Sequence, residues 1–258
     1  MQPISGQLSG KVALVTGAAR GLGRAYCEAL AAEGAAIVAA DLNDCAETVA
    51  AAEAQGGRAL SVRVDVADAA SCEAMAAAAM TEFGRIDVLI NNAALYADLT
   101  GARFEQLDEA QWDRVMAVNI KGTWLASKAV VAPMRASGNG GSIINIASLA
   151  AVYGLPYGLD YVASKAAVIG MTRGMARELG GDQIRVNAVA PSAVLTEGTE
   201  EFFGEKFEKA KAVIASGQVI RRNLDTADIT GTVVYLASDA SRMVTGQTHM
   251  VDGGSWFL

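Results

Sequence analysis

The chain has 258 residues, of which 52% are hydrophobic and 19% are charged, and its formal net charge at pH 7 is −7. A chain of this size buries about 70–75% of its unfolded surface, which allows a large core. The negative charge argues against binding to nucleic acid or to anionic membranes. No apolar run reaches the roughly 18 residues of a membrane span, and the first ten residues lack a signal-peptide pattern. We therefore expect a cytoplasmic protein.

Segments typical of strands and helices alternate along the chain. Strands are predicted at 11–16, 35–41, 59–64, 86–91, 142–147, 184–190 and 247–251. Helices are predicted at 22–33, 44–55, 71–82, 108–136, 160–179, 200–215 and 226–237. This alternation predicts an α/β fold with a doubly wound, seven-stranded parallel sheet and helices on both faces. No repeat or linker divides the chain, so we expect one domain over residues 1–258, in which 192–217 form a substrate lid.

The first predicted strand ends in three glycines, Gly17, Gly21 and Gly23, and a helical pattern follows them. Glycines at such a turn let the backbone approach a pyrophosphate closely, and the helix N-terminus adds free N–H groups. The next strand ends at Asp41, whose carboxylate can hydrogen-bond an adenosine ribose and repels a 2′-phosphate. These features together predict a dinucleotide site at the ends of the first two strands.

Tyr161 and Lys165 lie four residues apart on a predicted helix and therefore share one face. A nearby ammonium favours the phenolate, so we expect Lys165 to lower the pKa of Tyr161 toward the range of a general acid or base. Ser148 precedes this pair by thirteen residues. The Tyr–Lys spacing alone is a weak signal, because a surface lysine beside a packed tyrosine also produces it.

The three cysteines, Cys27, Cys45 and Cys72, have no metal-like spacing, and we expect reduced thiols and no metal site. The single histidine, His249, lies in the last predicted strand, where packing is the expected role and a Ser-His-Asp triad is not.

At these motifs the chain resembles the short-chain dehydrogenases/reductases, over nearly its whole length. The resemblance rests on residues 16–23, Asp65-Val66, 91–93, Asn119, Ser148, Tyr161 with Lys165, 191–196 and 251–254. It implies a Rossmann fold and hydride transfer between a nicotinamide cofactor and a secondary alcohol or ketone.

The resemblance also implies a role for each catalytic residue. Tyr161 acts as general acid or base, and Ser148 orients the substrate oxygen. Lys165 lowers the tyrosine pKa and holds the nicotinamide ribose, and Asn119 completes a proton relay through a water. The implied cofactor-binding residues are Gly17, Arg20, Gly21, Leu22, Gly23, Asp41, Leu42, Asp65, Val66, Asn92, Ala93, Ala94, Tyr161, Lys165, Pro191, Val194 and Thr196.

Two residues give opposite indications of cofactor choice. Arg20 occurs in family members that use a 2′-phosphate, whereas Asp41 opposes one and Leu42 adds no positive charge. We predict NAD, with NADP disfavoured and Arg20 directed to solvent or to the pyrophosphate. Ser192 departs from the family, where glycine commonly follows the proline, which puts the local turn and pocket in doubt.

The predicted substrate pocket is largely apolar and consists of Tyr96, Leu149, Tyr153, Tyr157, Ser192 and Phe202. Glu197, Glu200 and Glu201 in the lid should disfavour anions, so we expect a neutral, hydrophobic or aryl-substituted alcohol or ketone. A 3-oxoacyl reductase acting on acyl-carrier or CoA substrates is an alternative, although Asn139 and Asp182 stand where acyl-carrier enzymes have basic residues. A non-catalytic NAD-binding protein, or a non-redox enzyme of the same fold, are further alternatives.

Three segments indicate a homotetramer. Helix 160–179 carries small residues at Ala163, Ala167, Gly170 and Gly174. Helix 108–136 carries apolar residues at Val115, Val118, Leu125, Ala129 and Ala132. The chain ends in Trp256-Phe257-Leu258, which is costly to expose to water. By resemblance, the two helices pair between subunits and the C-terminal segments form a second interface.

Overall fold

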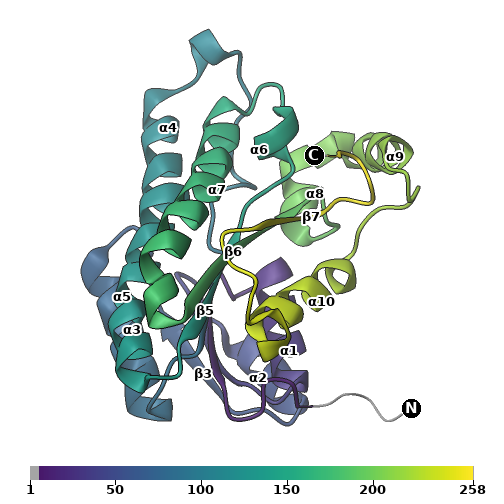
Figure 1. Ribbon diagram of the computed structural model, residues 1–258. Coiled ribbons are helices and arrows are strands. Elements are labelled where there is room, and N and C mark those ends of the chain that lie inside the picture. The colour runs from purple at the N-terminus through teal and green to yellow at the C-terminus, as the bar shows by residue number, and fades with distance from the viewer. Residues whose placement is uncertain (1–5, 258) are drawn as a thin grey trace.

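Seven parallel strands form one sheet in the computed structural model, which describes residues 6–257. The strands are β1 (Val12–Thr16), β2 (Ala36–Asp41), β3 (Ala59–Arg63), β4 (Val88–Asn91), β5 (Gly141–Ile146), β6 (Ile184–Pro191) and β7 (Thr248–Val251). Their order across the sheet is β3-β2-β1-β4-β5-β6-β7. The prediction of a seven-stranded parallel sheet is confirmed (Figure 1).

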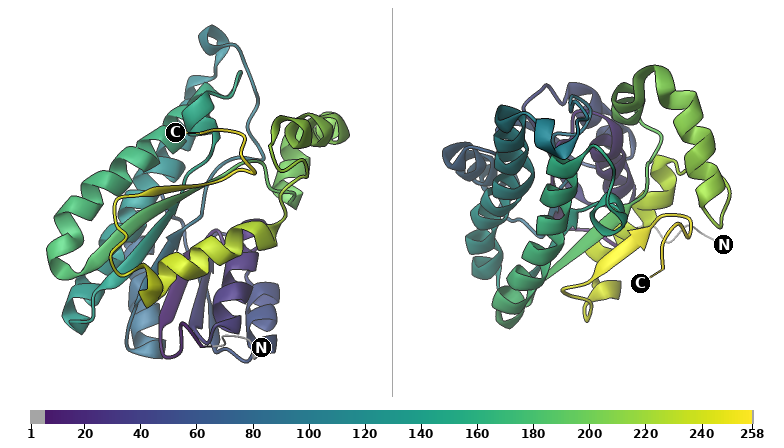
Figure 2. Two further views of the ribbon diagram at one scale, coloured as in Figure 1. Left: turned by 45° about the vertical axis from the view of Figure 1, so that its right-hand side comes forward. Right: turned by 90° about the horizontal axis from the view of Figure 1, so that it is seen from above.

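Helices cover both faces of the sheet, as predicted (Figures 1 and 2). The helices are α1 (Gly21–Ala32), α2 (Ala46–Ala54), α3 (Ala69–Phe83), α4 (Glu109–Val115), α5 (Thr123–Ser137), α6 (Ala150–Tyr153), α7 (Leu159–Leu179), α8 (Glu197–Phe203), α9 (Phe207–Gly217) and α10 (Thr226–Ala237). Side chains of α1, α2 and α10 pack on one face, and those of α3, α5 and α7 pack on the other. Among the described residues, no helix is long and apolar enough to cross a bilayer.

Strand β1 shows why the sheet needs two helical layers. All five of its residues are buried. Ala13 and Val15 pack in the core under α1 and α10, whereas Val12 and Leu14 pack in the core under α3 and α5. Successive side chains of a strand point to opposite faces, so a fully apolar strand is stable only when both faces are covered.

The predicted helix 108–136 is interrupted in the structure. A π-helical segment, η2 (Met116–Gly122), joins α4 to α5, and the buried Asn119 lies at its centre. A π-helical turn inserts one extra residue into the helical ladder and reorients the side chains near it. The predicted helix 200–215 also divides, into α8, the short turn η4 (Gly204–Lys206) and α9.

The strand order reverses between β1 and β4, because the chain winds outward from this point in both directions. Helices cannot cover the carboxyl ends of the strands there, so a crevice opens that binds ligands in doubly wound folds. Thr16 ends β1, Asn91 ends β4 and Pro191 ends β6 at this edge. The sequence motifs identified above follow these strand ends.

Candidate active site

The glycine turn after β1 is held against the loop after β4. Gly17 has a φ of +65°, and a Cβ there would lie only 2.7 Å from the Ala93 Cα. A Cβ on Gly23 would overlap the Gly17 carbonyl oxygen. The Asn92 side chain donates to the carbonyl oxygens of Thr16 (3.1 Å) and Gly17 (2.9 Å). The glycines are therefore required by close packing, and Asn92 fixes the shape of the turn.

Asp41 connects the end of β2 to this turn. Its Oδ2 accepts a hydrogen bond from the Ala19 backbone N–H at 3.0 Å, and its Oδ1 accepts from the Asn43 N–H at 2.9 Å. Leu42 is 55% exposed beside it and carries no charge. The carboxylate is thus fixed next to the glycine turn, where the sequence placed an adenosine ribose.

Arg20 is about half exposed to solvent, and its side chain also has a protein partner. Its guanidinium donates two hydrogen bonds to Glu201 of α8, at 2.5 and 2.7 Å. The hydrogen-bonded carboxylate raises the pKa of Arg20, and the guanidinium lowers the pKa of Glu201. The glycine turn and α8 are therefore joined by an ion pair that the sequence did not predict.

Tyr161 and Lys165 project from α7, and Ser148 follows β5. Burial raises the pKa of Tyr161 to about 12, and a hydrogen bond with Ser148 opposes this shift. The expectation that Lys165 lowers the pKa of Tyr161 below its usual value is not met in this structure. The Lys165 Nζ lies 5.8 Å from the centre of the Tyr161 ring, and burial dominates the phenol's environment.

Lys165 is itself buried and donates a hydrogen bond from Nζ to the Ile146 carbonyl oxygen at 2.7 Å. Burial lowers its pKa to about 8, because desolvation disfavours the ammonium. A buried tyrosine with a raised pKa beside a buried lysine with a lowered pKa is an arrangement typical of proton-transfer sites.

Asn119 supports this group from the π-helical segment. Its Oδ1 accepts from the Leu95 N–H at 2.8 Å, and its Nδ2 donates to the Leu95 carbonyl (3.2 Å) and to the Ser164 Oγ (3.1 Å). The carboxamide therefore joins the loop after β4 to helix α7, one residue before Lys165. The π-helical turn explains how an asparagine fits inside a helical pattern.

A cleft of about 990 Å³ brings most of the predicted residues together. The predicted residues that line it are Leu22, Asn92, Ala94, Tyr96, Ser148, Leu149, Tyr153, Tyr161, Lys165, Pro191, Ser192, Val194, Thr196 and Phe202. Predicted residues outside this lining are Gly17, Arg20, Gly21, Gly23, Asp41, Leu42, Asp65, Val66, Ala93, Asn119 and Tyr157. Most of the second group belongs to the glycine turn and the ends of β2 and β3.

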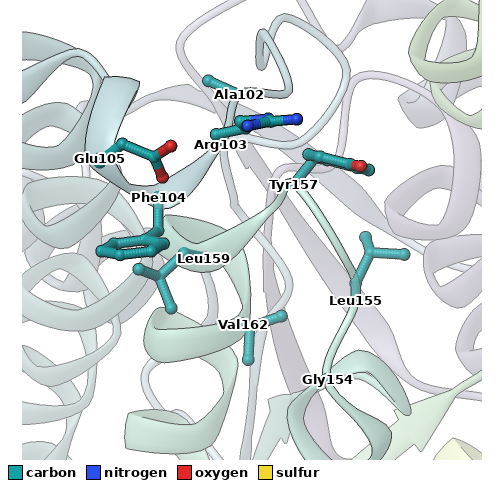
Figure 3. A pocket seen from close by; sticks show the side chains of 9 residues that line it. All are labelled: Ala102, Arg103, Phe104, Glu105, Gly154, Leu155, Tyr157, Leu159 and Val162. Carbon is teal, nitrogen blue, oxygen red and sulfur yellow. The ribbon is translucent and has the colours of Figure 1, made fainter.

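Tyr157 is the one predicted pocket residue that the structure places elsewhere. It is 65% exposed with a φ of +63°, and it lines a separate hollow of about 580 Å³. Figure 3 shows this hollow with Phe104 and Leu159, the first residue of α7, on one side and with Tyr157 and Leu155 on the other. The sequence could not separate the two hollows, because Tyr153 ends α6 and Tyr157 lies only four residues later, in the loop before α7.

Aromatic side chains from the segment after β6 cover the cleft. The Phe202 ring stacks on Tyr96 with centroids 4.5 Å apart, and Tyr96 lies 5.2 Å from the Tyr161 ring. Phe203 packs edge-on against Phe202. This contact chain connects α8 to the tyrosine of α7 and gives the cleft an apolar wall.

The comparisons with known proteins agree with this site. A family model described as enoyl-(acyl carrier protein) reductase matches residues 17–255. D-threitol dehydrogenase of Mycolicibacterium smegmatis is 42% identical, over 96% of this chain and 94% of its own. The chain belongs to the short-chain dehydrogenase/reductase family.

One further relative and one solved structure are similar to this short-chain dehydrogenase/reductase over nearly its full length. Galactitol 2-dehydrogenase of Agrobacterium fabrum is 41% identical, with 97% of this chain and 99% of the relative covered. A solved structure from Sinorhizobium meliloti 1021, assigned as a short-chain alcohol dehydrogenase, superposes with a TM-score of 0.91 and 36% identity, covering 98% of each chain. The protein is therefore a dehydrogenase or reductase of this fold.

Dehydrogenases of the short-chain family use nicotinamide cofactors, and the residues of this chain fit one. Gly17 and Gly23 leave room that a Cβ would fill, and α1 begins at Gly21 with its N–H groups directed to the turn. The fixed Asp41 carboxylate suits a ribose hydroxyl. Lys165 and Tyr161 line the cleft, where the nicotinamide half would lie beside them.

The structure also shows lining residues that the sequence did not reveal. Lys206, Lys209 and Ile214 line the cleft, whereas Glu197, Glu200 and Glu201 do not. Positions 206, 210, 213, 214 and 217 follow helical spacing, which was the available signal. The three glutamates of the lid therefore do not exclude anions from the cleft, because they are not among its lining residues.

The C-terminal tail folds back on its own chain. The Trp256 N–H and the Gly254 N–H each donate to the buried Asp252 carboxylate at 3.0 Å, and Trp256 lines the cleft. Leu258, the last residue of the predicted tail, lies outside the described residues. His249 lies in β7 and is not part of the cleft lining, and burial lowers its pKa.

Proposed function

We propose that this protein transfers a hydride between NAD(H) and a secondary alcohol or its ketone, with an apolar or aryl body. The observation that carries the proposal is the placement of Ser148, Tyr161 and Lys165 in one apolar cleft, next to the glycine turn. The bound cofactor supplies or accepts the hydride. The protein manages one proton and the position of the substrate.

Tyr161 is proposed as the group that exchanges the proton with the substrate oxygen. The phenol is protonated at neutral pH and can donate to a ketone oxygen, whereas its pKa, raised by burial, makes it a weaker acid than a free tyrosine. Ser148 hydrogen-bonds the same oxygen and orients it toward the phenol. The Lys165 ammonium favours the phenolate in the reverse direction, and Asn119 holds the loop and helix that position these groups.

NAD is proposed over NADP because of Asp41. Its two oxygens are fixed by backbone N–H groups, so the carboxylate cannot turn away from a 2′-phosphate. A carboxylate and a phosphate placed next to each other repel strongly in a partly buried site. Arg20, the nearest cation of the turn, is engaged by Glu201.

The segment 192–217 is proposed as the substrate lid. It supplies Phe202 and Phe203 to the apolar wall and is joined to the glycine turn through Glu201. A lid of this kind excludes water from the reacting groups and commits the substrate.

A homotetramer is proposed as the assembly. Gly170 and Gly174 are exposed on α7 with open space around them, and Trp124 on α5 is 49% exposed. By contrast, Val115 and Leu125 are buried within the chain itself, so they give no support to an interface. An exposed face of small residues on α7 beside an exposed tryptophan on α5 suits pairing of these helices.

Spectrophotometry of the reduced nicotinamide tests the activity directly. Aryl secondary alcohols, acyclic polyols and acetoacetyl-CoA should be assayed with NAD(H) and with NADP(H) in parallel. We expect oxidation of aryl secondary alcohols with NAD. The similarity to threitol and galactitol dehydrogenases makes a polyol the second candidate substrate, although the cleft wall is mainly apolar. Activity only with acetoacetyl-CoA would favour a 3-oxoacyl reductase, and binding of NAD without any turnover would favour a non-catalytic protein.

A further inference from the structure

Two lysines of the lid segment line the cleft, and both are exposed to solvent. Lys206 ends the turn η4, and Lys209 lies three residues later in α9. Residues three apart on a helix are neighbours on one side. Ala210, Val213 and Ile214 line the same cleft, so this side of α9 is its inward face. Lys206 and Lys209 are therefore part of the cleft wall.

The charge of the cleft is opposite to the charge of the chain. The chain carries 28 acidic residues and a net charge of −7. Among the described residues that line the cleft, there are three lysines and no aspartate or glutamate. A cleft lined by one sign of charge attracts ligands of the opposite sign.

Neither lysine is neutralised by a protein carboxylate within residues 6–257. The acidic groups of the lid have other partners, since Glu201 pairs with Arg20 and Glu208 pairs with Lys211. Lys206 and Lys209 take part in no salt bridge of the described chain. Their ammonium groups are thus available to a ligand in the cleft.

The position of the two lysines favours the substrate over the cofactor. Asp41 and the three glycines Gly17, Gly21 and Gly23, which suit the adenosine half of a cofactor, do not line this cleft, although Leu22 of the same turn does. Lys206 and Lys209 share it with Phe202, Phe203 and Trp256. Figures 1 and 2 show α9 standing apart from the helical layers, and both α9 and α7, which carries Tyr161, contribute residues to the cleft lining.

We propose that Lys206 and Lys209 bind an anionic group of the substrate, at the end remote from the reacting carbon. The substrate would be a secondary alcohol or ketone with an apolar body, an oxygen at Tyr161 and Ser148, and a carboxylate or phosphate at the lysines. This inference rests on the proposed function and adds an anionic group to its substrate. It replaces the expectation from the sequence alone, which was a neutral substrate.

Matched ketones that differ only in charge test the inference by binding. The dissociation constants of para-acetylbenzoate and para-acetylbenzamide should be measured by calorimetry with saturating NAD, which cannot reduce them. The corresponding acetylbiphenyl carboxylate and amide place the carboxylate or amide farther from the ketone. We expect the carboxylate of at least one pair to bind about tenfold more tightly than the amide, and the preference to fall with salt. Acetoacetyl-CoA tests phosphate as the anion.

Variants assign the effect to the two lysines. K206A/K209A should remove the preference for the carboxylate, or weaken coenzyme A thioester binding about tenfold, with amide binding unchanged within about twofold. Lys211, which does not line the cleft, gives the matched control, and K211A should keep the preference. Equal binding of acid and amide in both pairs, with thioester binding unaffected by K206A/K209A, would overturn the inference.

The same reagents separate this inference from the proposed function. Reduction of the neutral ketones with NADH, without any anion preference in binding, refutes the anion site and leaves the oxidoreductase proposal standing. An anion preference that K206A/K209A abolishes, without consumption of NADH or NADPH, supports the anion site and counts against the oxidoreductase proposal.

Discussion

Arg20 and Glu201 are 181 positions apart in the sequence, yet two hydrogen bonds join the glycine turn to α8 through them. Each side chain is about half exposed, so the pair contributes little to stability. Its location matters more, because Arg20 is the only basic residue in the glycine turn, residues 17–23. If this turn binds the cofactor as proposed, Glu201 would hold that cation away from a 2′-phosphate.

Glu201→Gln should release Arg20 and weaken discrimination against the phosphorylated cofactor. We expect the ratio of NADPH to NADH dissociation constants to fall about three- to fivefold, as suits one exposed ion pair. Fluorescence titration of both cofactors measures the ratio. Glu200→Gln, one residue earlier and outside any ion pair of the described chain, is the control. An unchanged ratio in E201Q would show that Arg20 does not approach the cofactor.

Asp41 should dominate cofactor choice. Asp41→Ala combined with Leu42→Arg removes a fixed carboxylate and adds a cation, so kcat/KM should shift toward NADP by about 10²-fold or more. Asp44→Asn, which alters an exposed carboxylate nearby, should leave the preference unchanged. A wild-type enzyme that already prefers NADP in kcat/KM would contradict the role given to Asp41.

Tyr161→Phe should lower kcat by about 10²–10⁴-fold while NADH still binds, because the variant lacks only the phenolic hydroxyl that carries the exchangeable proton. Steady-state rates and a cofactor titration together measure this. Tyr157→Phe removes the same atom from the exposed tyrosine outside the cleft and should keep kcat within about twofold. Near-normal turnover in Y161F would exclude Tyr161 as the proton donor.

Lys165→Met should abolish activity and stabilise the cofactor-free protein. Burial lowers the pKa of Lys165 to about 8, so the folded state binds fewer protons than the unfolded state above that pH. The buried ammonium therefore destabilises the folded state below pH 8. We expect the variant to gain about 1–3 kcal/mol in the free energy of unfolding at pH 7, even after loss of the hydrogen bond to Ile146.

Chemical denaturation of wild type and K165M across pH 7–9 measures this difference in the free energy of unfolding. The advantage of the variant should be constant below pH 8 and should shrink above it, as wild-type Lys165 loses its proton. Because both proteins share every other titrating group, the difference isolates this lysine. An advantage that does not change with pH would show that Lys165 is not desolvated.

Gly174→Arg should dissociate the proposed tetramer, because a long charged side chain would occupy the open face of α7. Light scattering should give about four times the chain mass of 26.6 kDa for wild type and a smaller mass for G174R. Ala54→Arg, at the exposed end of α2, is the matched control. A wild-type mass near that of one chain would refute the assembly.

The sequence alone determined the order and type of the elements. Apolar runs of five to eight residues between helical patterns are sufficient to specify parallel strands, since period and length are local properties. The helix 226–237 was predicted with its observed bounds, and the structure shows a capping box of Asp225 and Asp228 at its start. Gly17 and Asp41 were found because they lie at the ends of predicted strands, whereas Tyr161, Lys165 and Ser148 were found from their spacing and from the family resemblance.

Only the tertiary structure decided how distant side chains meet. The Arg20–Glu201 pair and the inward face of α9 depend on how the lid folds over the sheet, which no local pattern encodes. The pKa of Tyr161 also depends on burial, and spacing to Lys165 gave the wrong sign for the free protein. Desolvation is a property of the whole packed site, so the charge state of the catalytic residues and the charge preference of the cleft became visible only in three dimensions.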